Sequence, residues 1–487
     1  MSASSRSQSS VSPSSFLQSG WATGYRTLEA EHAYGITDIE GTIPPELTGT
    51  LFRNGPGRFD RGGVAYGHPF DGDGMIAAVS FKAGRAHFQN RYVRTEGFIK
   101  ESQAGRILLK NVFGTLRPGG FWLNAFDFSF KNVANTNVIY WNGRLFALWE
   151  AAPPHRLDPA SLETFGTDDL GGVLAGGKPF TAHPRLEPQT GDLLAFGVRA
   201  GLVSDLALYR LTPSGQVQVE ATYTLPGFAF LHDFAFSDNY WIFFQSPLAL
   251  DPLPFVFGMK AAGECLRLAA DQPGRMLLIP RSGGQVRTIE TEPFFAFHHV
   301  NAFEQEGTIV LDSVRYEEYL TTLGNGDFRQ IDFDRVPQGW LWRSEIDVAT
   351  GEVRTRPLLR RAVEFPQIHP DRMGRSYRFV YLGATASADR NGPLQAIGKF
   401  DIQAGEAIFA NFAPEGFISE PVFVPRPESN SEDDGWVIAI VYDAQRQASD
   451  IVILDARSLD RIARLLLPHH VPYGLHGSFV PEVFVDF

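Results

Sequence analysis

The sequence of 487 residues contains only one cysteine, Cys265. A single thiol can form neither an internal disulfide nor a cysteine-rich zinc site, and this composition is typical of a reducing compartment. Long hydrophobic runs are also missing, because the densest apolar stretches, such as Tyr240–Phe244 and Trp436–Tyr442, have the length of strands. A membrane-spanning helix needs roughly 18 apolar residues. We therefore expect a cytoplasmic protein without a transmembrane helix.

Basic residues are too few for a typical nucleic-acid-binding protein. The chain has 43 Lys and Arg against 55 Asp and Glu, which gives a net charge of −12. Non-specific binding of nucleic acid requires a basic surface, and so does attachment to anionic lipid by charge alone. The sequence predicts neither of these activities, and no feature of it indicates an obligate protein partner.

Helical patterns are scarce, whereas turn-forming residues are abundant. The chain has 48 Gly and 32 Pro, and glycine permits tight turns while proline interrupts helices. Apolar runs such as Val138–Tyr140 and Leu145–Trp149 flank the turn pair Asn142-Gly143, which is typical of a β-hairpin. The one candidate helix, Ala160–Leu174, is weakened by its glycines. The sequence therefore predicts an all-β fold.

The chain divides into a short tail and one long β-rich region. Residues 1–15 are rich in serine, and a disordered tail is favoured over a transit peptide. No linker interrupts residues 16–487, which we interpret as a single domain. An all-β domain of this size is most simply built as a ring of four-stranded blades, because few sheet edges are then exposed.

Polar residues recur in strand-like settings at intervals close to the length of a blade. In chain order they are Glu150, His183, His232, His298, Glu364, Glu420 and His476. The last four intervals are 66, 66, 56 and 56 residues. Residues at equivalent positions of successive blades would lie at one depth near a central axis. The spacing thus predicts that several of these side chains meet.

The four histidines of this series lie in settings where an isolated imidazole is unfavourable. His232 lies in GFAFLHDFAF and His298 in FAFHHVNAF, while His183 lies in TAHP and His476 in GLHGSF. A buried imidazole needs a partner that offsets its lost hydration, and a shared metal ion is such a partner. Imidazole suits zinc, copper, iron or nickel, and catalytic zinc normally keeps three protein ligands. Redox-active iron(II) that binds dioxygen is one interpretation, and hydrolytic zinc is the alternative.

Three glutamates could complete this site. Glu150 ends LFALWE, Glu364 lies in VEFPQIHP and Glu420 lies in ISEPVFVP. A carboxylate that binds the second ring nitrogen of a ligating histidine fixes the orientation of the ring. Separate buried salt bridges are the alternative interpretation of these acids.

Aromatic residues accompany the candidate ligands, and two further segments are unusually apolar. The aromatic residues are Phe70, Trp149, Phe230, Phe297 and Phe365. They favour either a hydrophobic core or the lining of a channel for a long apolar substrate. Phe113–Phe130 and Pro247–Gly258 are too apolar for ordinary loops. Exposed apolar patches mark membrane or partner contact, and buried packing is the alternative.

These motifs occur together in one known family. They are RNGPG (Arg53–Gly57), HPFDGDGM (His68–Met75), PHRLDP (Pro154–Pro159), AHP at His183, LHDF at His232, FHHVNAFE at His298, EFPQIHP from Glu364, EPVFVPRP from Glu420, EDDGW (Glu432–Trp436) and LHGSF at His476. The sequence resembles the carotenoid cleavage oxygenases over nearly its whole length. DLGGVLA (Asp169–Ala175) adds a likeness to the cyanobacterial members that act on apocarotenoids. The resemblance implies a seven-bladed β-propeller with helices and loops capping its top face.

The resemblance also implies the roles of individual residues. An iron(II) ion, with O2 as co-substrate, would be bound by His183, His232, His298 and His476. Glu150, Glu364 and Glu420 would orient His232, His298 and His476 respectively, which leaves His183 without a glutamate. Thr136 would lie near an open position of the iron. The substrate tunnel would be lined by Tyr25, Phe70, Trp149, Phe230, Phe297, Tyr316 and Phe365.

The implied reaction is oxidative cleavage of the 15,15′ double bond of an apocarotenoid, which yields retinal and a second aldehyde. The apolar segments would place the protein peripherally on a membrane that supplies this substrate. Cleavage of a stilbene such as resveratrol is one alternative, although it commonly uses a tyrosine and a lysine and the ligand segments contain no lysine. Isomerisation of a retinoid and non-catalytic carotenoid carriage are the others. A carrier would have no need of four histidines.

Overall fold

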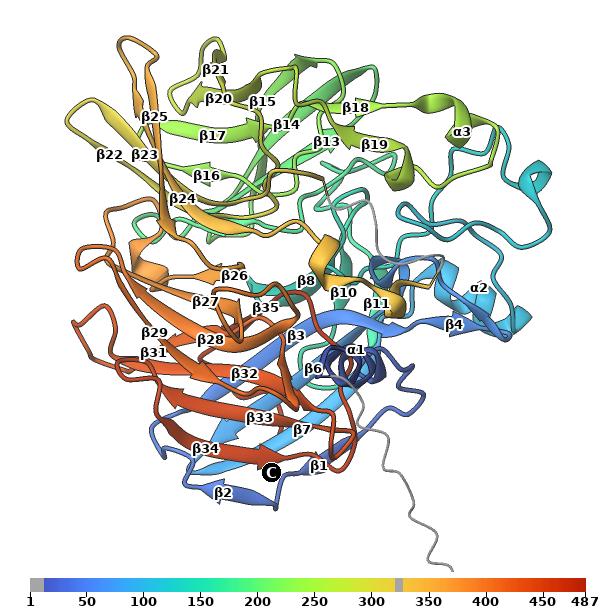
Figure 1. Cartoon of the computed structure of the whole chain (residues 1–487), viewed down its shortest axis with the longest axis vertical. Coiled ribbons are helices and arrows are strands. Elements are labelled where there is room, and N and C mark those ends of the chain that lie inside the picture. The colour runs from blue at the N-terminus through green and yellow to red at the C-terminus, as the bar shows by residue number, and fades with distance from the viewer. Residues whose placement is uncertain (1–12, 320–326) are drawn as a thin grey trace, which may run out of the picture.

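The computed structural model describes residues 13–319 and 327–487 of the chain. Seven antiparallel sheets of four to six strands are arranged around a common centre (Figure 1). The chain is a seven-bladed β-propeller, which confirms the predicted fold class. In five of these sheets the strands pair in the order in which they occur along the chain, so each of the five is a meander.

Five blades, here numbered 2 to 6, are continuous in sequence. Blade 2 contains β8 (Asn137–Trp141), β9 (Arg144–Leu148), β10 (His155–Leu157) and β11 (Thr164–Thr167). Blade 3 contains β12 (Arg185–Leu186), β13 (Leu193–Arg199), β14 (Val203–Leu211) and β15 (Val217–Pro226). Blade 4 contains β16 (Ala235–Phe236), β17 (Tyr240–Gln245), β20 (Gly274–Pro280) and β21 (Arg287–Thr291). Blade 5 contains β22 (His299–Gln305), β23 (Thr308–Arg315), β24 (Trp340–Asp347) and β25 (Val353–Leu359). Blade 6 contains β26 (Val363–Gln367), β27 (Phe379–Thr385), β28 (Leu394–Asp401) and β29 (Glu406–Asn411).

Blades 1 and 7 combine strands from both ends of the chain. Blade 1 contains β1 (Ala33–Gly35), β3 (Gly49–Arg58), β6 (Asp73–Lys82), β7 (Arg85–Tyr92) and β35 (Gly477–Val480). Blade 7 contains β2 (Ile39–Gly41), β30 (Gly416–Ile418), β31 (Val422–Pro425), β32 (Gly435–Asp443), β33 (Ala448–Asp455) and β34 (Arg461–Leu466). β35 pairs with β3 and β2 pairs with β34, so blue and red strands lie side by side in Figure 1. These two pairings close the ring.

The blades are covered on both faces, which explains their apolar sequences. In β6, nine of ten residues are buried, because neighbouring blades pack against both sides of the sheet. Strands in this situation are apolar almost throughout and do not alternate with polar residues. The core between blades 1 and 7 includes Val79, Phe81, Trp436 and Ile438.

The structure confirms most predicted strands and corrects the predicted helix. The hairpin of Val138–Tyr140 and Leu145–Trp149 corresponds to β8 and β9. Ala160–Leu174 is not helical, since it forms β11 and turns. Leu162 has a φ of 59° and Leu170 a φ of 51°, and positive φ values at these positions are incompatible with a right-handed helix.

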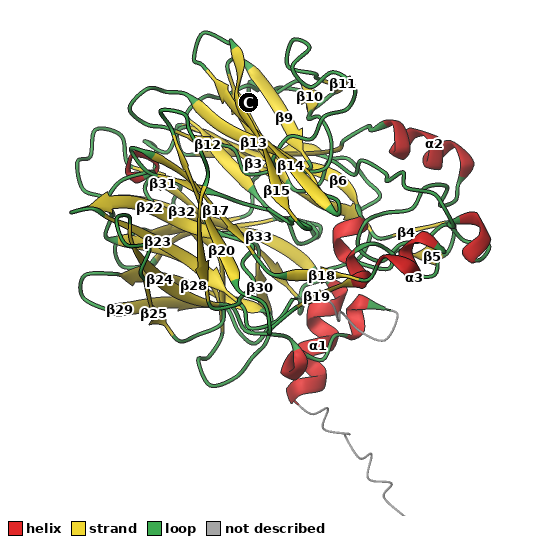
Figure 2. Ribbon diagram, turned by 90° about the horizontal axis from the view of Figure 1, so that it is seen from above, coloured by secondary structure: helices red, strands yellow, loops and turns green. Residues whose placement is uncertain are grey.

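The three α-helices of the described residues and many irregular loops gather on one side of the sheets and form a cap (Figure 2). The helices are α1 (Pro13–Thr23), α2 (Glu96–Ala104) and α3 (Pro252–Val256), and two short ribbons pair β4 (Asp60–Arg61) with β5 (Val64–Ala65) and β18 (Leu248–Leu250) with β19 (Leu266–Leu268). Within the described residues, the 3-10 helices are Pro69–Asp71, Phe121–Leu123, Gly263–Cys265, Phe328–Gln330, Phe333–Arg335 and Pro370–Arg372. α1 includes the last three residues of the predicted tail, and residues 1–12 lie outside the described residues. In the described part of the chain, no helix is long and apolar enough to cross a membrane.

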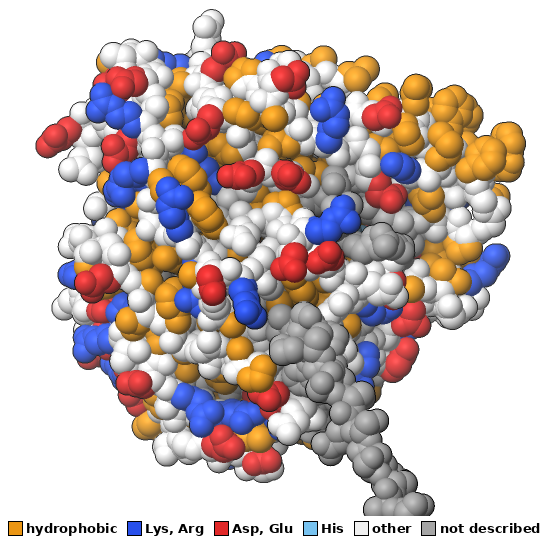
Figure 3. Space-filling model, in the orientation of Figure 1, with side chains coloured by type: hydrophobic (Ala, Val, Ile, Leu, Met, Phe, Trp, Pro, Cys, Tyr) orange, Lys and Arg blue, Asp and Glu red, His pale blue; other side chains and the backbone are white. Residues whose placement is uncertain are grey.

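The two apolar segments of the sequence lie against each other in the cap and expose hydrophobic side chains. The backbone N–H of Phe126 donates to the carbonyl of Val256 over 2.8 Å, and the Phe255 ring lies 5.8 Å from those of Phe128 and Phe130. The exposed residues, here called the apolar patch, are Phe121, Trp122, Leu123, Phe126, Phe128, Leu253, Phe257 and Met259. They account for the hydrophobic cluster at the upper right of Figure 3.

Candidate metal centre and aromatic cavity

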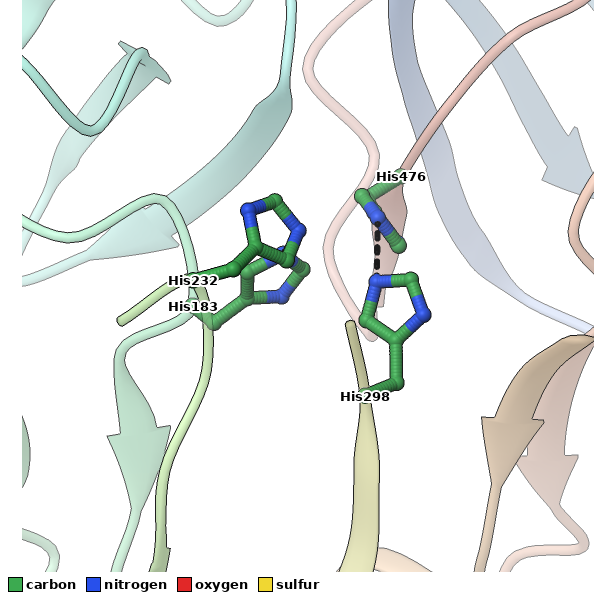
Figure 4. Close-up of side chains that lie close together, drawn as sticks. All are labelled: His183, His232, His298 and His476. Atoms are coloured by element: carbon green, nitrogen blue, oxygen red, sulfur yellow. Dashed lines mark hydrogen bonds between the residues drawn. The ribbon is translucent and has the colours of Figure 1, made fainter. Parts of the chain in front are cut away.

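Four histidines lie just before the innermost strands of four blades. His183 precedes β12, His232 precedes β16, His298 precedes β22 and His476 precedes β35. The chain approaches the centre of the propeller at each of these points, so residues far apart in sequence converge. In Figure 4, His183 and His232 face His298 and His476.

The remaining three blades present polar side chains at the equivalent point. Thr136 precedes β8, Glu364 lies in β26, and Glu420 lies between β30 and β31. The predicted series is corrected here, because Glu150 follows the second strand of blade 2 and not the first. Thr136 takes the inner position, and its Oγ1 donates to Glu150 Oε2 over 3.2 Å.

The Nε2 atoms of the four histidines point at one another. The Nε2 atoms of His183 and His232 are 2.9 Å apart, and those of His298 and His476 are 3.1 Å apart. One ring nitrogen from each of the four residues lies within 4.8 Å of the others. The adjacent residue His299 is directed elsewhere, with its Nδ1 bonded to Ser313 Oγ over 2.7 Å.

A glutamate binds the opposite nitrogen of three of the four rings. The Nδ1 atom of His232 lies 3.1 Å from Glu150 Oε1, that of His298 lies 2.5 Å from Glu364 Oε2, and that of His476 lies 2.9 Å from Glu420 Oε1. In a neutral ring, the proton that binds the carboxylate is on Nδ1 and the lone pair is on Nε2. The carboxylates therefore direct three lone pairs toward the centre.

Each glutamate is itself held by further donors, some of which the sequence analysis missed. Glu364 accepts bonds from the hydroxyl of Tyr316 over 2.6 Å and the backbone N–H of Phe365 over 2.7 Å. Glu420 accepts bonds from Arg53, and from Gln367 Nε2 over 3.0 Å. Arg53 lies in RNGPG and Gln367 in EFPQ, and neither motif alone indicates a contact with Glu420.

The buried charges shift the pKa values of the site. Burial raises the pKa of Glu420, but the opposing charges of Arg53 and His476 outweigh it and lower the pKa to about 2. Burial, reinforced by the charges of the neighbouring histidines, lowers the pKa of His183 well below its ordinary value. Glu420 is thus ionised and His183 neutral near neutral pH, as metal coordination requires.

The donor set fits a divalent ion of the iron type. The four ring nitrogens lie within 4.8 Å of one another, and the two closest Nε2 pairs are 2.9 and 3.1 Å apart, so one ion could contact several of them. Two inward lone pairs at such a distance repel unless a cation or a proton lies between them. Four imidazoles without a ligating carboxylate or thiolate suit iron, copper, zinc or nickel.

An aromatic cavity of about 220 Å³ opens onto this cluster. Of the expected tunnel residues, it is lined by Tyr25, Phe70, Thr136, Trp149, Phe297, Tyr316 and Phe365. Phe230 does not line it, because its ring packs against those of Phe295, Phe297 and Tyr319. The cavity is also lined by residues that no sequence motif indicated, namely Trp21, Phe113, Leu394, Phe417 and Tyr473.

A second cavity, of about 520 Å³, also reaches the cluster. Its lining includes Arg185, Asp233 and Gln367 together with His183 and His298. Polar and charged side chains thus distinguish it from the aromatic cavity, which is lined mainly by rings.

Comparisons with known proteins identify the family. The family described as "Retinal pigment epithelial membrane protein" matches residues 25–481. Apocarotenoid-15,15′-oxygenase of Synechocystis sp. is 46% identical over 480 residues, covering 97% of this chain and 98% of the relative. Resveratrol cleavage oxygenase 1 of Aspergillus fumigatus is 33% identical and covers 91% of each chain. The crystal structure of cobalt-substituted Synechocystis apocarotenoid oxygenase matches with a TM-score of 0.93 at 46% identity, over 95% of this chain and 98% of that one. Agreement in sequence and fold along nearly the whole chain shows that the protein belongs to the carotenoid cleavage oxygenase family.

Proposed function

We propose that this protein is an iron(II)-dependent dioxygenase that cleaves the 15,15′ double bond of apocarotenoids, giving retinal and a second aldehyde. The observation that carries the proposal is the convergence of four imidazoles at an aromatic cavity. The likeness to the Synechocystis enzyme supports the choice of substrate and bond.

In this proposal, His183, His232, His298 and His476 hold the iron through Nε2. Iron(II) supplies the redox chemistry that allows dioxygen to react with a conjugated double bond. Glu150, Glu364 and Glu420 fix three of the rings, so the ligands are pre-organised before the metal binds.

The remaining residues position the substrate and exclude water. Phe70, Trp149 and Phe297 offer flat apolar surfaces to a conjugated chain. The hydroxyls of Thr136 and Tyr316 donate to glutamates, which leaves few free polar groups that would hold water in the cavity. Such a cavity binds a polyene by burial of apolar area and aims one double bond at the metal. No side chain is required as a general acid or base.

The apolar patch supports delivery of the substrate from a membrane surface. Apocarotenoids partition into lipid, and a patch that enters the upper part of a bilayer gives access to them without crossing it. We infer that the protein acts as a peripheral membrane protein.

An aerobic assay tests the proposal. Iron-loaded protein is incubated with a long-chain β-apocarotenal in detergent, and the products are separated by chromatography. Retinal that forms only with both iron and O2 is expected, and His232→Ala should bind no iron and form no product. Other aldehydes would contradict the choice of bond, and the absence of any product from iron-loaded protein would contradict cleavage of apocarotenals.

Stilbenes are a second candidate substrate class because of the relative from Aspergillus fumigatus. Among the described residues, no lysine lines the aromatic cavity. Lys110 donates to the carbonyl of Asp127, and Lys131 pairs with Asp73 and Glu101. Resveratrol therefore ranks second and serves as the alternative substrate in the same assay.

A further inference from the structure

Arg185 follows His183 by two residues, and its guanidinium connects three histidine-bearing blades. Its Nη2 and Nε lie 2.7 and 3.4 Å from the two carboxylate oxygens of Asp233. Nη2 also donates to the carbonyl of His299 over 2.6 Å, and Nη1 to the carbonyl of Val300 over 3.3 Å. One side chain of blade 3 therefore binds the entry segments of blades 4 and 5.

Asp233, the acidic partner of Arg185, also binds the backbone of the entry segments of blades 4 and 5. It directly follows His232, and its Oδ2 accepts the backbone N–H of His299 over 2.8 Å. Its Oδ1 accepts the backbone N–H of Phe234 over 2.8 Å. His299 in turn follows His298, so the pair is joined to the backbone beside three of the four histidines.

The pair is buried, and its geometry depends on arginine. The side chains of Arg185 and Asp233 are 10% and 2% exposed. A buried ion pair adds little net stability, because the cost of desolvation offsets the attraction. The planar guanidinium can, however, bind several acceptors at fixed angles, and a lysine ammonium cannot reproduce that arrangement.

We propose that Arg185 is a positioning residue that fixes the mutual placement of His183, His232 and His298 and thereby sets the affinity and geometry of the metal site. This inference rests on the proposed function, because it assumes that the four histidines bind a metal. It assigns Arg185 no contact with substrate or with the reacting atoms.

The chain contains a matched control pair. Arg343 binds Asp312 through two bonds of 2.8 Å, and the two side chains are 12% and 0% exposed. They lie opposite each other on β24 and β23 of blade 5. The pair reproduces the burial and bidentate geometry of Arg185 and Asp233, but it joins strands of one blade and not entry segments of three.

The experiment compares Arg185→Lys with Arg343→Lys in the full-length protein, using Co(II) as the probe. Affinity is measured by competition with a chelator, geometry by the visible absorption spectrum of bound Co(II), and folding by thermal unfolding. We expect Arg185→Lys to bind Co(II) roughly tenfold or more weakly, as for other residues that hold metal ligands in place, with a changed spectrum. Arg343→Lys should match the wild-type protein in both measurements.

Wild-type affinity and spectrum in Arg185→Lys would overturn the inference, as would equal losses in both variants. Should Arg185→Lys not fold, the uncharged double variant Arg185→Met with Asp233→Asn is used, since it leaves no unpaired charge. Wild-type Co(II) binding by that variant would again contradict the inference. Failure of the wild-type chain itself to bind Co(II) would contradict the proposed metal site together with the inference.

Discussion

Glu420 and Glu364, two of the three glutamates of the site, differ in what balances their charge. Glu420 has a cationic partner in Arg53, whereas Glu364 has the neutral donors Tyr316 and Phe365 besides His298. The imidazole of His298 therefore interacts with a carboxylate that has no other cation bonded to it. Burial alone lowers the pKa of His298, but Glu364 outweighs it and raises that pKa. Loss of the Glu364 charge is therefore expected to lower the pKa of the His298 imidazole.

Replacement of Glu364 by glutamine should weaken iron binding by roughly 10–100-fold, as the loss of an orienting carboxylate does elsewhere. The amide keeps the size of the side chain but not its charge. Competition with a chelator measures the affinity. Glu304→Gln is the control, because Glu304 accepts bonds from Ser237 and Asn239 and from no histidine. Unchanged affinity in Glu364→Gln would remove Glu364 from this role.

The ion pair of Glu420 should make stability depend on pH in acid. The pKa of Glu420 falls from its ordinary value of 4.5 to about 2 on folding. The ionised group therefore stabilises the fold above pH 4.5, and this contribution disappears as the pH falls toward 2. In metal-free protein, urea unfolding of wild type and Glu420→Gln should differ by about 3 kcal/mol more at neutral pH than near pH 2. A pH-independent difference would contradict this interpretation.

Local sequence indicated which histidines and glutamates to consider, because each lies in a conspicuously apolar segment. It could not indicate their contacts across blades. Arg53 and Glu420 are brought together only when the first and last blades meet, and Gln367 reaches Glu420 from blade 6. The position of Glu150 was misjudged for the same reason, since spacing does not distinguish the first strand of a blade from the second.

At the scale of elements, the cap segment Phe113–Phe130 exposes apolar side chains, and buried polar contacts hold it at both ends. Asp71 accepts the backbone N–H groups of Phe113, Gly114 and Thr115 over 2.8–3.0 Å. At the other end of this segment, Lys131 pairs with buried carboxylates. The exposed rings between these anchors are thus held outward. The apolar composition of the two segments is visible in the sequence, but their exposure is not, because it depends on how they pack together.

Loss of apolar side chains from the patch should reduce binding to neutral phosphatidylcholine vesicles. Trp122 is 79% exposed, and each large apolar side chain that enters lipid contributes roughly 1.5–3 kcal/mol. The double variant Trp122→Ser with Leu253→Ser should therefore bind vesicles at least tenfold more weakly, as measured by co-sedimentation. Ile408→Ser is the control, because Ile408 is exposed on β29, far from α3 (Figure 1). An equal loss in both proteins would argue against the patch.

The molecule as a whole depends on the strand that closes it. Composition and turn spacing predicted blades, yet the exchange of strands between blades 1 and 7 has no local signal, since β2 and β35 are only three and four residues long. β35 directly follows His476, so the closure of the ring and the placement of one histidine are coupled. Only glycine at position 477 allows β35 to approach β3 this closely, because a Cβ atom there would lie 2.0 Å from the carbonyl oxygen of Phe52.

Gly477→Ala should therefore separate β35 from β3, lower the melting temperature and weaken metal binding together. Gly35→Ala is the matched control, since Gly35 lies in β1 of the same blade and a Cβ atom there meets no atom within 4 Å. Thermal unfolding and chelator competition measure the two effects. Normal metal affinity in a destabilised Gly477→Ala protein would show that closure and the metal site are independent.

The late position of His476 also has a consequence in time. His476 is added to the growing chain 178 residues after His298, and β35 follows it. A growing chain that has not reached His476 holds at most three of the four imidazoles and lacks β35 of blade 1. The set of four imidazoles is therefore complete only once His476 has been added, and a chain that terminates before it lacks one of the four candidate ligands.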